Sequence, residues 1–161
     1  MKKLIILLIS AFFSLTSQAG SITVTLHSTA NLQEIGQIEF KDSDLGLLIV
    51  PNLHSLPAGL HGFHLHEHPN CDSHGNSAGS HFDPLKTNTH LGPYQKGHLG
   101  DLPVLYASED GQANTPLLAP RLKTTDLKAL AVMIHAGADN YSDTPPLGGG
   151  GERIACGVVK F

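Results

Sequence analysis

The chain has 161 residues, with 10 Lys and Arg against 14 Asp and Glu, 11 His and two Cys, and its formal net charge is −4. This length fits one domain, and an acidic chain without a Lys/Arg cluster excludes nucleic acid as a ligand. An anionic substrate would therefore need a local positive site to attract it.

The first 19 residues have the pattern of a secretory signal peptide. Lys2 and Lys3 begin it, a short apolar run follows, and small residues end it at Ala19. The pattern predicts cleavage after Ala19, and the run is too short to span a membrane. We therefore expect residues 20–161 to form one domain, exported to the periplasm and free of the membrane. Cleavage leaves 8 basic against 14 acidic residues, a net charge of −6.

Short apolar segments with alternating side chains follow one another along the rest of the chain. In the first, Ile22, Val24 and Leu26 alternate with polar residues, which is the pattern of a half-buried strand. The other expected strands are 36–40, 45–50, 60–66, 102–107, 112–118, 128–135 and 155–160. About eight short strands with almost no helix predict an all-β, antiparallel sandwich or barrel.

Two long irregular segments, 67–100 and 136–151, interrupt the strands and are rich in Gly and Pro. A loop as long as the first is uncommon in a compact domain unless it is functional or disordered. The four glycines Gly148–Gly151 resemble a phosphate-binding loop only in glycine content, so we expect a flexible connection there. Candidates to hold the first loop in place are Cys71, His81, His90 and His98.

Cys71 and Cys156 are the only cysteines. In an exported chain they favour a disulfide over free thiols. Such a bond would close a loop of 85 positions, for which chain entropy gives about 4.6 kcal/mol of stabilisation. A cysteine metal site is the weaker alternative, because the chain has no Cys-x-x-Cys.

The segment from Gly62 to His68, Gly-Phe-His-Leu-His-Glu-His, carries the first metal-site pattern. In a strand His64 and His66 share one face, while their neighbours Phe63 and Leu65 can enter a core. His135 repeats this arrangement at the end of another apolar strand. Imidazole is a good ligand for copper, zinc, nickel and iron, so these histidines are candidate metal ligands.

Five motifs occur in a fixed order: Gly-Phe-His-x-His, His-Phe-Asp-Pro, His-Leu-Gly-Asp-Leu, a strand-end His135, and Gly-Glu-Arg-Ile-Ala-Cys-Gly-Val-Val. Together they resemble the copper,zinc superoxide dismutases over about residues 21–161. The four-glycine run, the Pro-rich turn and the signal peptide make the chain most similar to the bacterial periplasmic branch. The resemblance implies an eight-stranded antiparallel Greek-key barrel, an immunoglobulin-like sandwich, with two long functional loops.

The same resemblance implies a role for each site residue. The implied copper ligands are His64, His66, His81 and His135. The implied zinc ligands are His81, His90, His98 and Asp101. Asp139 would link a ligand of each metal, Cys71 and Cys156 would form the disulfide, and Arg153 would guide anions to the copper.

Coordination chemistry agrees with these implied sets. Four imidazoles can hold copper as Cu(II) or Cu(I), and three imidazoles with a carboxylate give zinc a closed tetrahedral site. The implied activity is the conversion of superoxide anion to dioxygen and hydrogen peroxide, in which His81 could take up a proton. The zinc site would also hold the 67–100 loop in place.

Other functions compete with this one. The main alternative is a non-catalytic copper/zinc binding protein or metallochaperone of the same fold. A third alternative, a purely structural sandwich, does not explain why the chain contains ten histidines besides His27. Glu67 between histidines suggests a metalloprotease, but the helical His-Glu-x-x-His pattern is absent. The alternative for Asp139 is a carboxylate that caps a turn, and the alternative for Arg153 is an ordinary surface residue.

Five histidines fall outside the implied ligand sets. His61 shares the face of Phe63 and Leu65, so we expect it to have a hydrogen-bonded structural role. We expect the others to be solvated; they are His27, His54, His68 and His74. For His68 and His74, which are closest to the site in the sequence, metal loading is the alternative.

Two further hypotheses concern partners. The segment after His135 has no row of charged residues, so Lys86 or Lys96 is a candidate to steer superoxide together with Arg153. We expect a homodimer but assign no particular surface to it. Tyr94 and Tyr106 are the candidate contact residues.

Overall fold

A computed structural model describes residues 20–160, and the predicted signal peptide at 1–19 lies outside the described residues. Within residues 20–160 no helix is long and apolar enough to cross a membrane. Three short 3-10 helices lie in the connections: η1 (Asn76–Ala78), η2 (Thr124–Leu127) and η3 (Pro146–Gly149). The strands are β1 (Ser21–Ser28), β2 (Glu34–Ser43), β3 (Gly46–Leu53), β4 (Gly59–His61), β5 (Phe63–His66), β6 (Leu105–Ala107), β7 (Leu117–Ala119), β8 (Ala131–His135) and β9 (Arg153–Val158).

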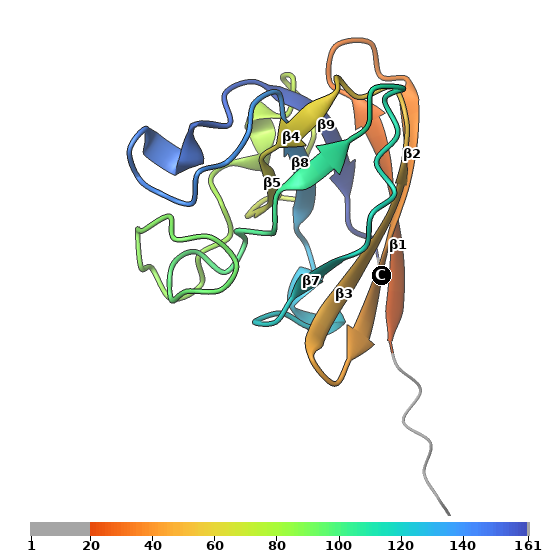
Figure 1. The fold of residues 1–161 in the computed structure, drawn as a ribbon. Helices are drawn as coiled ribbons and strands as arrows, with labels where there is room; N and C mark the ends of the chain where they lie inside the picture. Colours follow the sequence, from red (N-terminus) through yellow and green to blue (C-terminus); the bar gives the residue numbers. More distant parts are fainter. Residues whose placement is uncertain (1–19, 161) are drawn as a thin grey trace, which may run out of the picture.

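The strands form a curled antiparallel sheet that closes around one core. Seven strands pair in the order β5-β8-β9-β1-β2-β3-β7, and β4 pairs with β6 in a second, two-stranded sheet. Figure 1 shows β1, β2 and β3 on one side of the molecule and β4, β5 and β8 on the other. The prediction of an all-β antiparallel fold is confirmed.

Alternation along the strands explains this core. In β1, Val24 and Leu26 are buried while the residues between them are more exposed. Because successive side chains of a strand point to opposite faces, each strand contributes every second residue to the interior. The same core contains Ile38, Phe40, Leu47, Ile49, Phe63, Leu65, Val132 and Ile134.

Residues 20–160 form nine strands instead of about eight, because the predicted strand over 60–66 divides at Gly62. The amide of Gly62 donates to the carbonyl of Gly137 at 2.7 Å, and its carbonyl accepts from the amide of His135 at 2.8 Å. These bonds to a distant loop leave β4 and β5 to pair in different sheets. The division places β5 next to β8.

Three predicted strands are shorter than the sequence suggests. The strand predicted over 128–135 forms only as β8, which begins at Ala131. Only the end of 102–107 forms β6, and β7 begins at Leu117 although the alternation extends over 112–118. Pro103 and Pro116 lie in or beside the missing parts of these two strands, and proline has no amide hydrogen for a ladder. In the part of 112–118 that precedes β7, only Ala113 pairs with a strand, through an isolated β-bridge to Leu53.

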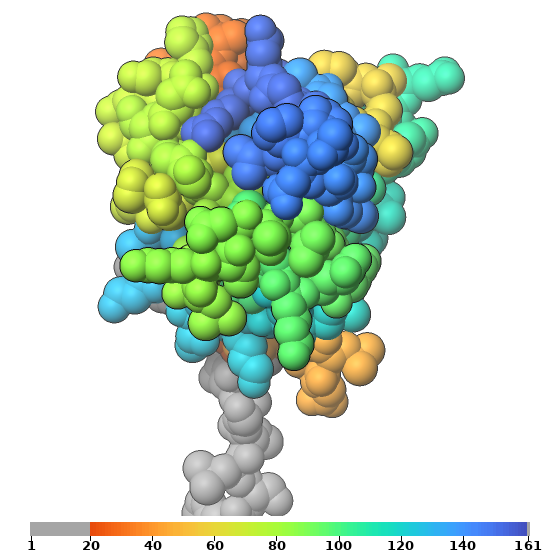
Figure 2. All heavy atoms as spheres, turned by 90° about the vertical axis from the view of Figure 1, so that its left-hand side faces the viewer, coloured from red at the N-terminus to blue at the C-terminus, as the bar shows by residue number. Residues whose placement is uncertain are grey.

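The two irregular loops gather on one side of the barrel. In Figure 1 the green segment around residues 80–100 and the blue segment 136–150 lie on the left, away from β1, β2 and β3. Figure 2, which views this side directly, shows the yellow-green, green and blue parts of the chain covering it. The outer face of β5, which would otherwise meet water, is therefore enclosed by loops.

Candidate metal centre

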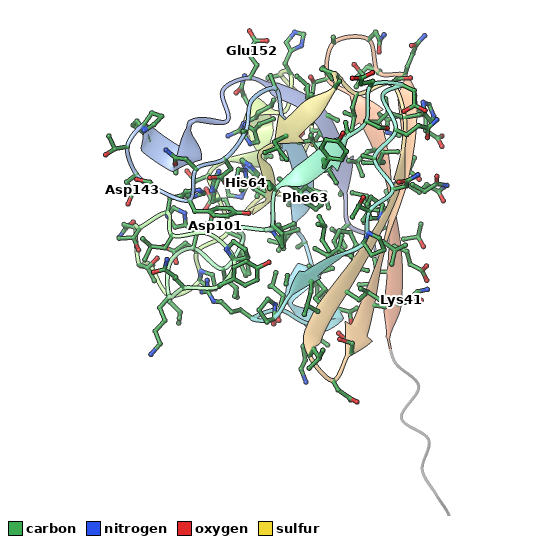
Figure 3. All side chains as sticks on the ribbon, in the orientation of Figure 1. Lys41, Phe63, His64, Asp101, Asp143 and Glu152 are labelled. Carbon is green, nitrogen blue, oxygen red and sulfur yellow. A yellow bond between two sulfur atoms is a disulfide. The ribbon has the colours of Figure 1, made fainter. Side chains whose placement is uncertain are left out.

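Two neighbouring strands place three of the histidines. His64 and His66 alternate in β5 with Phe63 and Leu65, which belong to the hydrophobic core. His135 ends β8, which pairs antiparallel with β5. Figure 3 shows Phe63 on the barrel side of β5 and His64 on the side of the loops. The loops leave His64 and His66 fully buried, with 0% of their surface exposed.

The loop that follows β5 folds back onto the strand. The amide of Leu65 donates to Gly100 O at 2.8 Å, and its carbonyl accepts from a loop amide at 2.9 Å. Isolated β-bridges then pair His66 with His81 and His64 with Asp101. Backbone hydrogen bonds therefore set the positions of His81 and Asp101 beside the strand histidines.

The buried side chains converge in two groups that share His64 and His81. The potential ligand atoms of each group lie within 4.8 Å of one another. The first group is His64, His66, His81 and His135, and the second is His64, His81, His90 and Asp101. His98 adjoins the second group, because its Nδ1 lies 3.4 Å from Asp101 Oδ1. The Nδ1 atoms of His81 and His90 lie 3.0 Å from the same oxygen.

Hydrogen bonds on the far side of the rings determine which nitrogen faces each group. His66 Nδ1 donates to Gly79 O at 2.9 Å, and His135 Nδ1 donates to Gly151 O at 3.0 Å. Since a carbonyl oxygen only accepts, each Nδ1 carries the proton. The Nε2 atoms of both rings therefore present lone pairs to the first group.

Asp139 fixes the tautomers of two further rings, in which Nε2 rather than Nδ1 carries the proton. It accepts from His64 Nε2 at 2.7 Å and from His90 Nε2 at 2.8 Å. The Nδ1 atoms of these two rings are thereby left to face the centre. Asp139 thus joins one ring of the first group to one ring of the second.

The unpaired atoms provide a test of whether a metal fits. In the described part of the chain, five buried side-chain nitrogen or oxygen atoms lack a hydrogen-bond partner, and all five belong to these histidines. They are His64 Nδ1, His66 Nε2, His90 Nδ1, His98 Nδ1 and His135 Nε2. Buried polar atoms are normally paired, so a group that accepts lone pairs is the missing partner. Cations bound by imidazole fit this donor set.

Electrostatics favour neutral rings in the first group. Burial lowers the pKa of His64 to about 3 and that of His135 to about 4. Burial also lowers the pKa of His66 and of His81, although Asp101 beside His81 opposes the shift. Neutral imidazole is the form that binds metal, so this group is ready to bind near neutral pH.

His90 behaves in the opposite way because it lies between two carboxylates. Burial opposes its protonation, but Asp139, which accepts from Nε2, and the charge of Asp101, 3.0 Å from Nδ1, raise the pKa of His90 to about 9. Burial alone would raise the pKa of both carboxyl groups, yet their histidine partners hold each pKa well below the usual range. A cation at Nδ1 would therefore displace a proton from His90.

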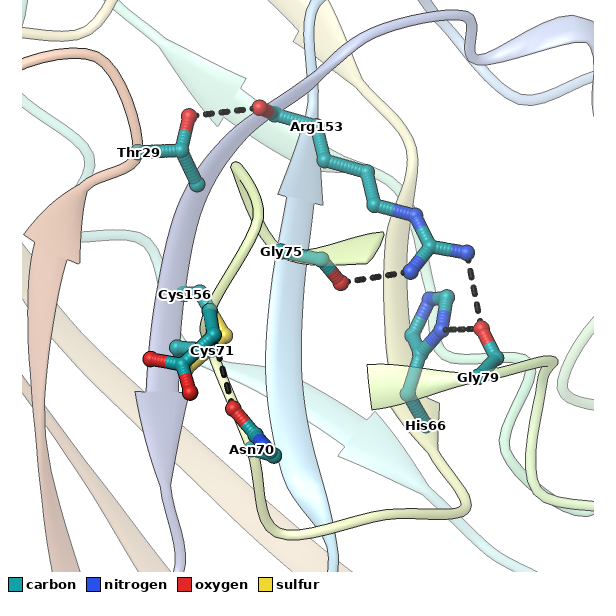
Figure 4. The surroundings of a disulfide bond; sticks show 9 residues. Thr29, His66, Asn70, Cys71, Gly75, Gly79, Arg153 and Cys156 are labelled. Carbon is teal, nitrogen blue, oxygen red and sulfur yellow. Dashed lines mark hydrogen bonds between the residues drawn. A yellow bond between two sulfur atoms is a disulfide. The ribbon is translucent and has the colours of Figure 1, made fainter. Parts of the chain in front are cut away.

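Arg153 and the disulfide stabilise the loop beside the first group. The Arg153 guanidinium donates to Gly75 O at 2.6 Å and to Gly79 O at 2.7 Å. Figure 4 shows that Gly79 O also accepts from His66, so the arginine and a histidine of the first group share one carbonyl. A disulfide joins Cys71 to Cys156 at the base of the same loop. The half-buried guanidinium is therefore held in a fixed position beside His66.

The remaining histidines lie outside both groups. His61 is buried, with Nδ1 at 2.7 Å from His135 O and Nε2 at 2.8 Å from Pro57 O, which agrees with a structural role. His68 is exposed beside Glu67. His54 and His74 are also exposed, and His74 Nδ1 lies 2.9 Å from Thr29 O.

Two residues of the second loop were not identified by the sequence reasoning. Asp143 accepts from the backbone amide of His90 at 3.0 Å. The amide of Tyr141 donates to Asp139 at 2.7 Å, and its hydroxyl accepts from the amide of Val104 at 2.8 Å. The polar run after Asp139 was the only available signal, because backbone partners leave no trace in a sequence.

Comparisons with known proteins point to one family. A family model described as copper/zinc superoxide dismutase (SODC) matches residues 34–159. A Cu-Zn superoxide dismutase of Legionella pneumophila is 52% identical over 157 residues, which is 97% of each chain. The solved Cu/Zn superoxide dismutase from Brucella abortus is 42% identical, with a TM-score of 0.82, over 88% of this chain and 100% of that one. The monomeric copper, zinc superoxide dismutase from Salmonella enterica is 45% identical, with a TM-score of 0.76 and the same coverages.

Proposed function

The chain belongs to the copper/zinc superoxide dismutase family, and we propose how its own residues hold the two metals and serve the family's reaction. That reaction converts two superoxide anions and two protons into dioxygen and hydrogen peroxide. We assign copper to His64 Nδ1 and to the Nε2 atoms of His66, His81 and His135. The observation that carries this assignment is that three of the unpaired nitrogens, His64 Nδ1, His66 Nε2 and His135 Nε2, belong to the first group.

For the zinc site we choose His98 over His64. The second group contains His64 by distance, but His64 Nε2 already donates to Asp139 and its Nδ1 faces the first group. His98 Nδ1 is unpaired and 3.4 Å from Asp101 Oδ1. His81, His90, His98 and Asp101 then form a closed set of three nitrogens and one oxygen, which suits a structural zinc.

Copper in the first set would supply the one-electron redox chemistry, and the chain's residues would supply charge, orientation and a proton. Arg153 places a fixed cation beside His66 in a chain of net negative charge, so it attracts the superoxide anion. His81 is the imidazole shared by both sets. Its Nε2, when released, can hold the proton that the departing peroxide needs. Asp139 keeps His64 and His90 in the required tautomers.

Export and association complete the proposal. Residues 1–19 serve as a signal peptide cleaved after Ala19, and the domain works in the periplasm without membrane attachment. The disulfide between Cys71 and Cys156 supports this location, because such bonds persist in oxidising compartments. Tyr94 and Tyr106 are 65% and 51% exposed and are available as the contacts of a homodimer. Light scattering coupled to gel filtration would distinguish this dimer from a monomer.

The test compares His135→Ala with a control, His54→Ala, which removes an exposed histidine outside both groups. We expect His135→Ala to lose copper and superoxide conversion while keeping zinc, as measured by metal analysis and a superoxide-decay assay. His54→Ala should keep both metals and the activity. Full activity in His135→Ala would refute the ligand assignment. A parent chain that holds both metals without converting superoxide would instead support the metallochaperone alternative.

A further inference from the structure

The four-glycine run is not a loose connection, because it packs against the metal centre. Gly148 has φ of +77°, a conformation that favours glycine. Its amide donates to Ser142 O at 2.9 Å, and its carbonyl accepts from the amide of Asn140 at 3.1 Å. These two bonds hold the Gly148 backbone against the turn that follows Asp139.

The space beside Gly148 is filled by the residues that link the two metal groups. A Cβ added there would overlap Asp139 Oδ1, and it would lie 2.5 Å from Asp139 Cγ and 2.7 Å from His90 Nε2. Side-chain carbons do not approach other heavy atoms within 3.0 Å, so one partner would have to move. Gly148 itself is buried and held on both sides by backbone bonds, which leaves Asp139 as the group that shifts.

Asp139 has little freedom to move without losing its partners. Its carboxylate accepts from His64 Nε2, His90 Nε2 and the amide of Tyr141, at distances from 2.7 to 2.9 Å. A shift large enough to admit a methyl group would break at least one of these bonds. The ring of His64 or His90 would then be free to rotate away from its metal.

We propose that Gly148 is a positioning residue for both metal groups: its missing side chain is what allows the Asp139 carboxylate to reach His64 and His90 together. The inference rests on the ligand assignment proposed above and adds to it a residue that contacts no metal ligand through a side chain. It predicts that one methyl group at position 148 weakens metal binding through Asp139.

The neighbouring glycine provides a matched control. Gly149 has φ of +78°, and a Cβ added there would meet only atoms of Pro145, the nearest at 2.6 Å. Gly148→Ala and Gly149→Ala therefore cause similar backbone strain, and each brings the new methyl group within 3.0 Å of another atom, with the larger conflict at Gly148. They differ in whether the conflict involves Asp139 and His90.

The experiment measures zinc affinity by competition with a chromophoric chelator and records the Nε2–H signals of His64 and His90 by NMR. We expect Gly148→Ala to bind zinc about 10- to 100-fold more weakly, the usual effect of losing a hydrogen-bond partner of a metal ligand. Both Nε2–H signals should shift or disappear. In Gly149→Ala the zinc affinity should stay within about threefold of the parent value, with both signals in place. Equal losses in the two variants would overturn the inference.

A double variant tests whether the effect passes through Asp139. In an Asp139→Ala background two of the three close contacts are gone and the His90 ring, no longer bonded to Asp139, can move away from the methyl group. Gly148→Ala should therefore add less than about threefold to the loss. An additional loss as large as in the parent chain would overturn the inference. If Gly148→Ala alone does not fold, the double variant should fold and bind zinc like Asp139→Ala, and failure to do so would also overturn it. A parent chain that binds no zinc would overturn the proposed ligand set instead.

Discussion

Zinc binding to the metal-free protein should release about one proton near neutral pH, whereas copper binding to the zinc-free protein should release almost none. The difference comes from His90, whose pKa is raised to about 9 between Asp101 and Asp139. At pH 7 a group with this pKa is about 99% protonated. Zinc requires the lone pair of His90 Nδ1, while Nε2–H remains on Asp139. The Nδ1 proton must therefore leave when zinc binds.

The size of the effect follows from the number of protons released. One proton makes zinc affinity rise about tenfold for each pH unit between pH 7 and 8, and the rise should level off above pH 9. The lowered pKa values of His64, about 3, and His135, about 4, mean that the copper ligands are already neutral at pH 6. The copper affinity of the zinc-free protein should therefore change little between pH 6 and 8.

Isothermal titration calorimetry in buffers of different ionisation enthalpy counts these protons directly. Asp139→Asn provides a control, because it removes one of the two carboxylates that raise the pKa of His90. The proton count for zinc should then fall. A zinc affinity that does not depend on pH from 7 to 8, or an equal proton count for copper, would refute this account of His90.

Three further predictions concern the loop, the substrate and acid. Asp101→Ala should release zinc and loosen the 67–100 loop while the copper ligands remain, and unchanged hydrogen exchange in that loop would contradict this. Arg153→Ala should slow superoxide conversion and flatten its dependence on salt, as measured by stopped-flow decay at several ionic strengths. Because burial depresses the pKa of His64 and His135 in the folded chain, the unfolded chain binds more protons below about pH 6.5. The metal-free protein should therefore lose stability from about pH 6.5 down to pH 3, and denaturant titrations that show constant stability there would refute this.

The strands and the position of the strand histidines were largely predictable, because both depend on local patterns. Alternation in 128–135 predicted that Val132 and Ile134 face the core, and both lie in it. The same two-residue period placed His64 and His66 together on the other face. The fold class followed from the number and length of such segments.

What the sequence did not reveal depends on backbone atoms and on empty space. The backbone carbonyl of Gly79 accepts hydrogen bonds from both His66 and Arg153, and no sequence pattern predicts such a backbone contact. Gly148 matters because it lacks a Cβ, and its neighbour Gly149 looks identical in the sequence. The division of 60–66 at Gly62 depends on a hydrogen bond to Gly137, 75 positions away in the chain. Such contacts become visible only when the loops are placed in space.

The unpaired nitrogens imply that metal binding and stability are coupled in this protein. His64 Nδ1, His66 Nε2 and His135 Nε2 are buried without a partner, and each such atom costs about 1–3 kcal/mol. Together they cost roughly 3–9 kcal/mol, which is comparable to the whole net stability of a typical domain. The disulfide, worth about 4.6 kcal/mol on chain entropy, offsets part of that cost and closes the loop that holds Arg153. A cation that pairs with these nitrogens should therefore stabilise the arrangement of the two loops over β5.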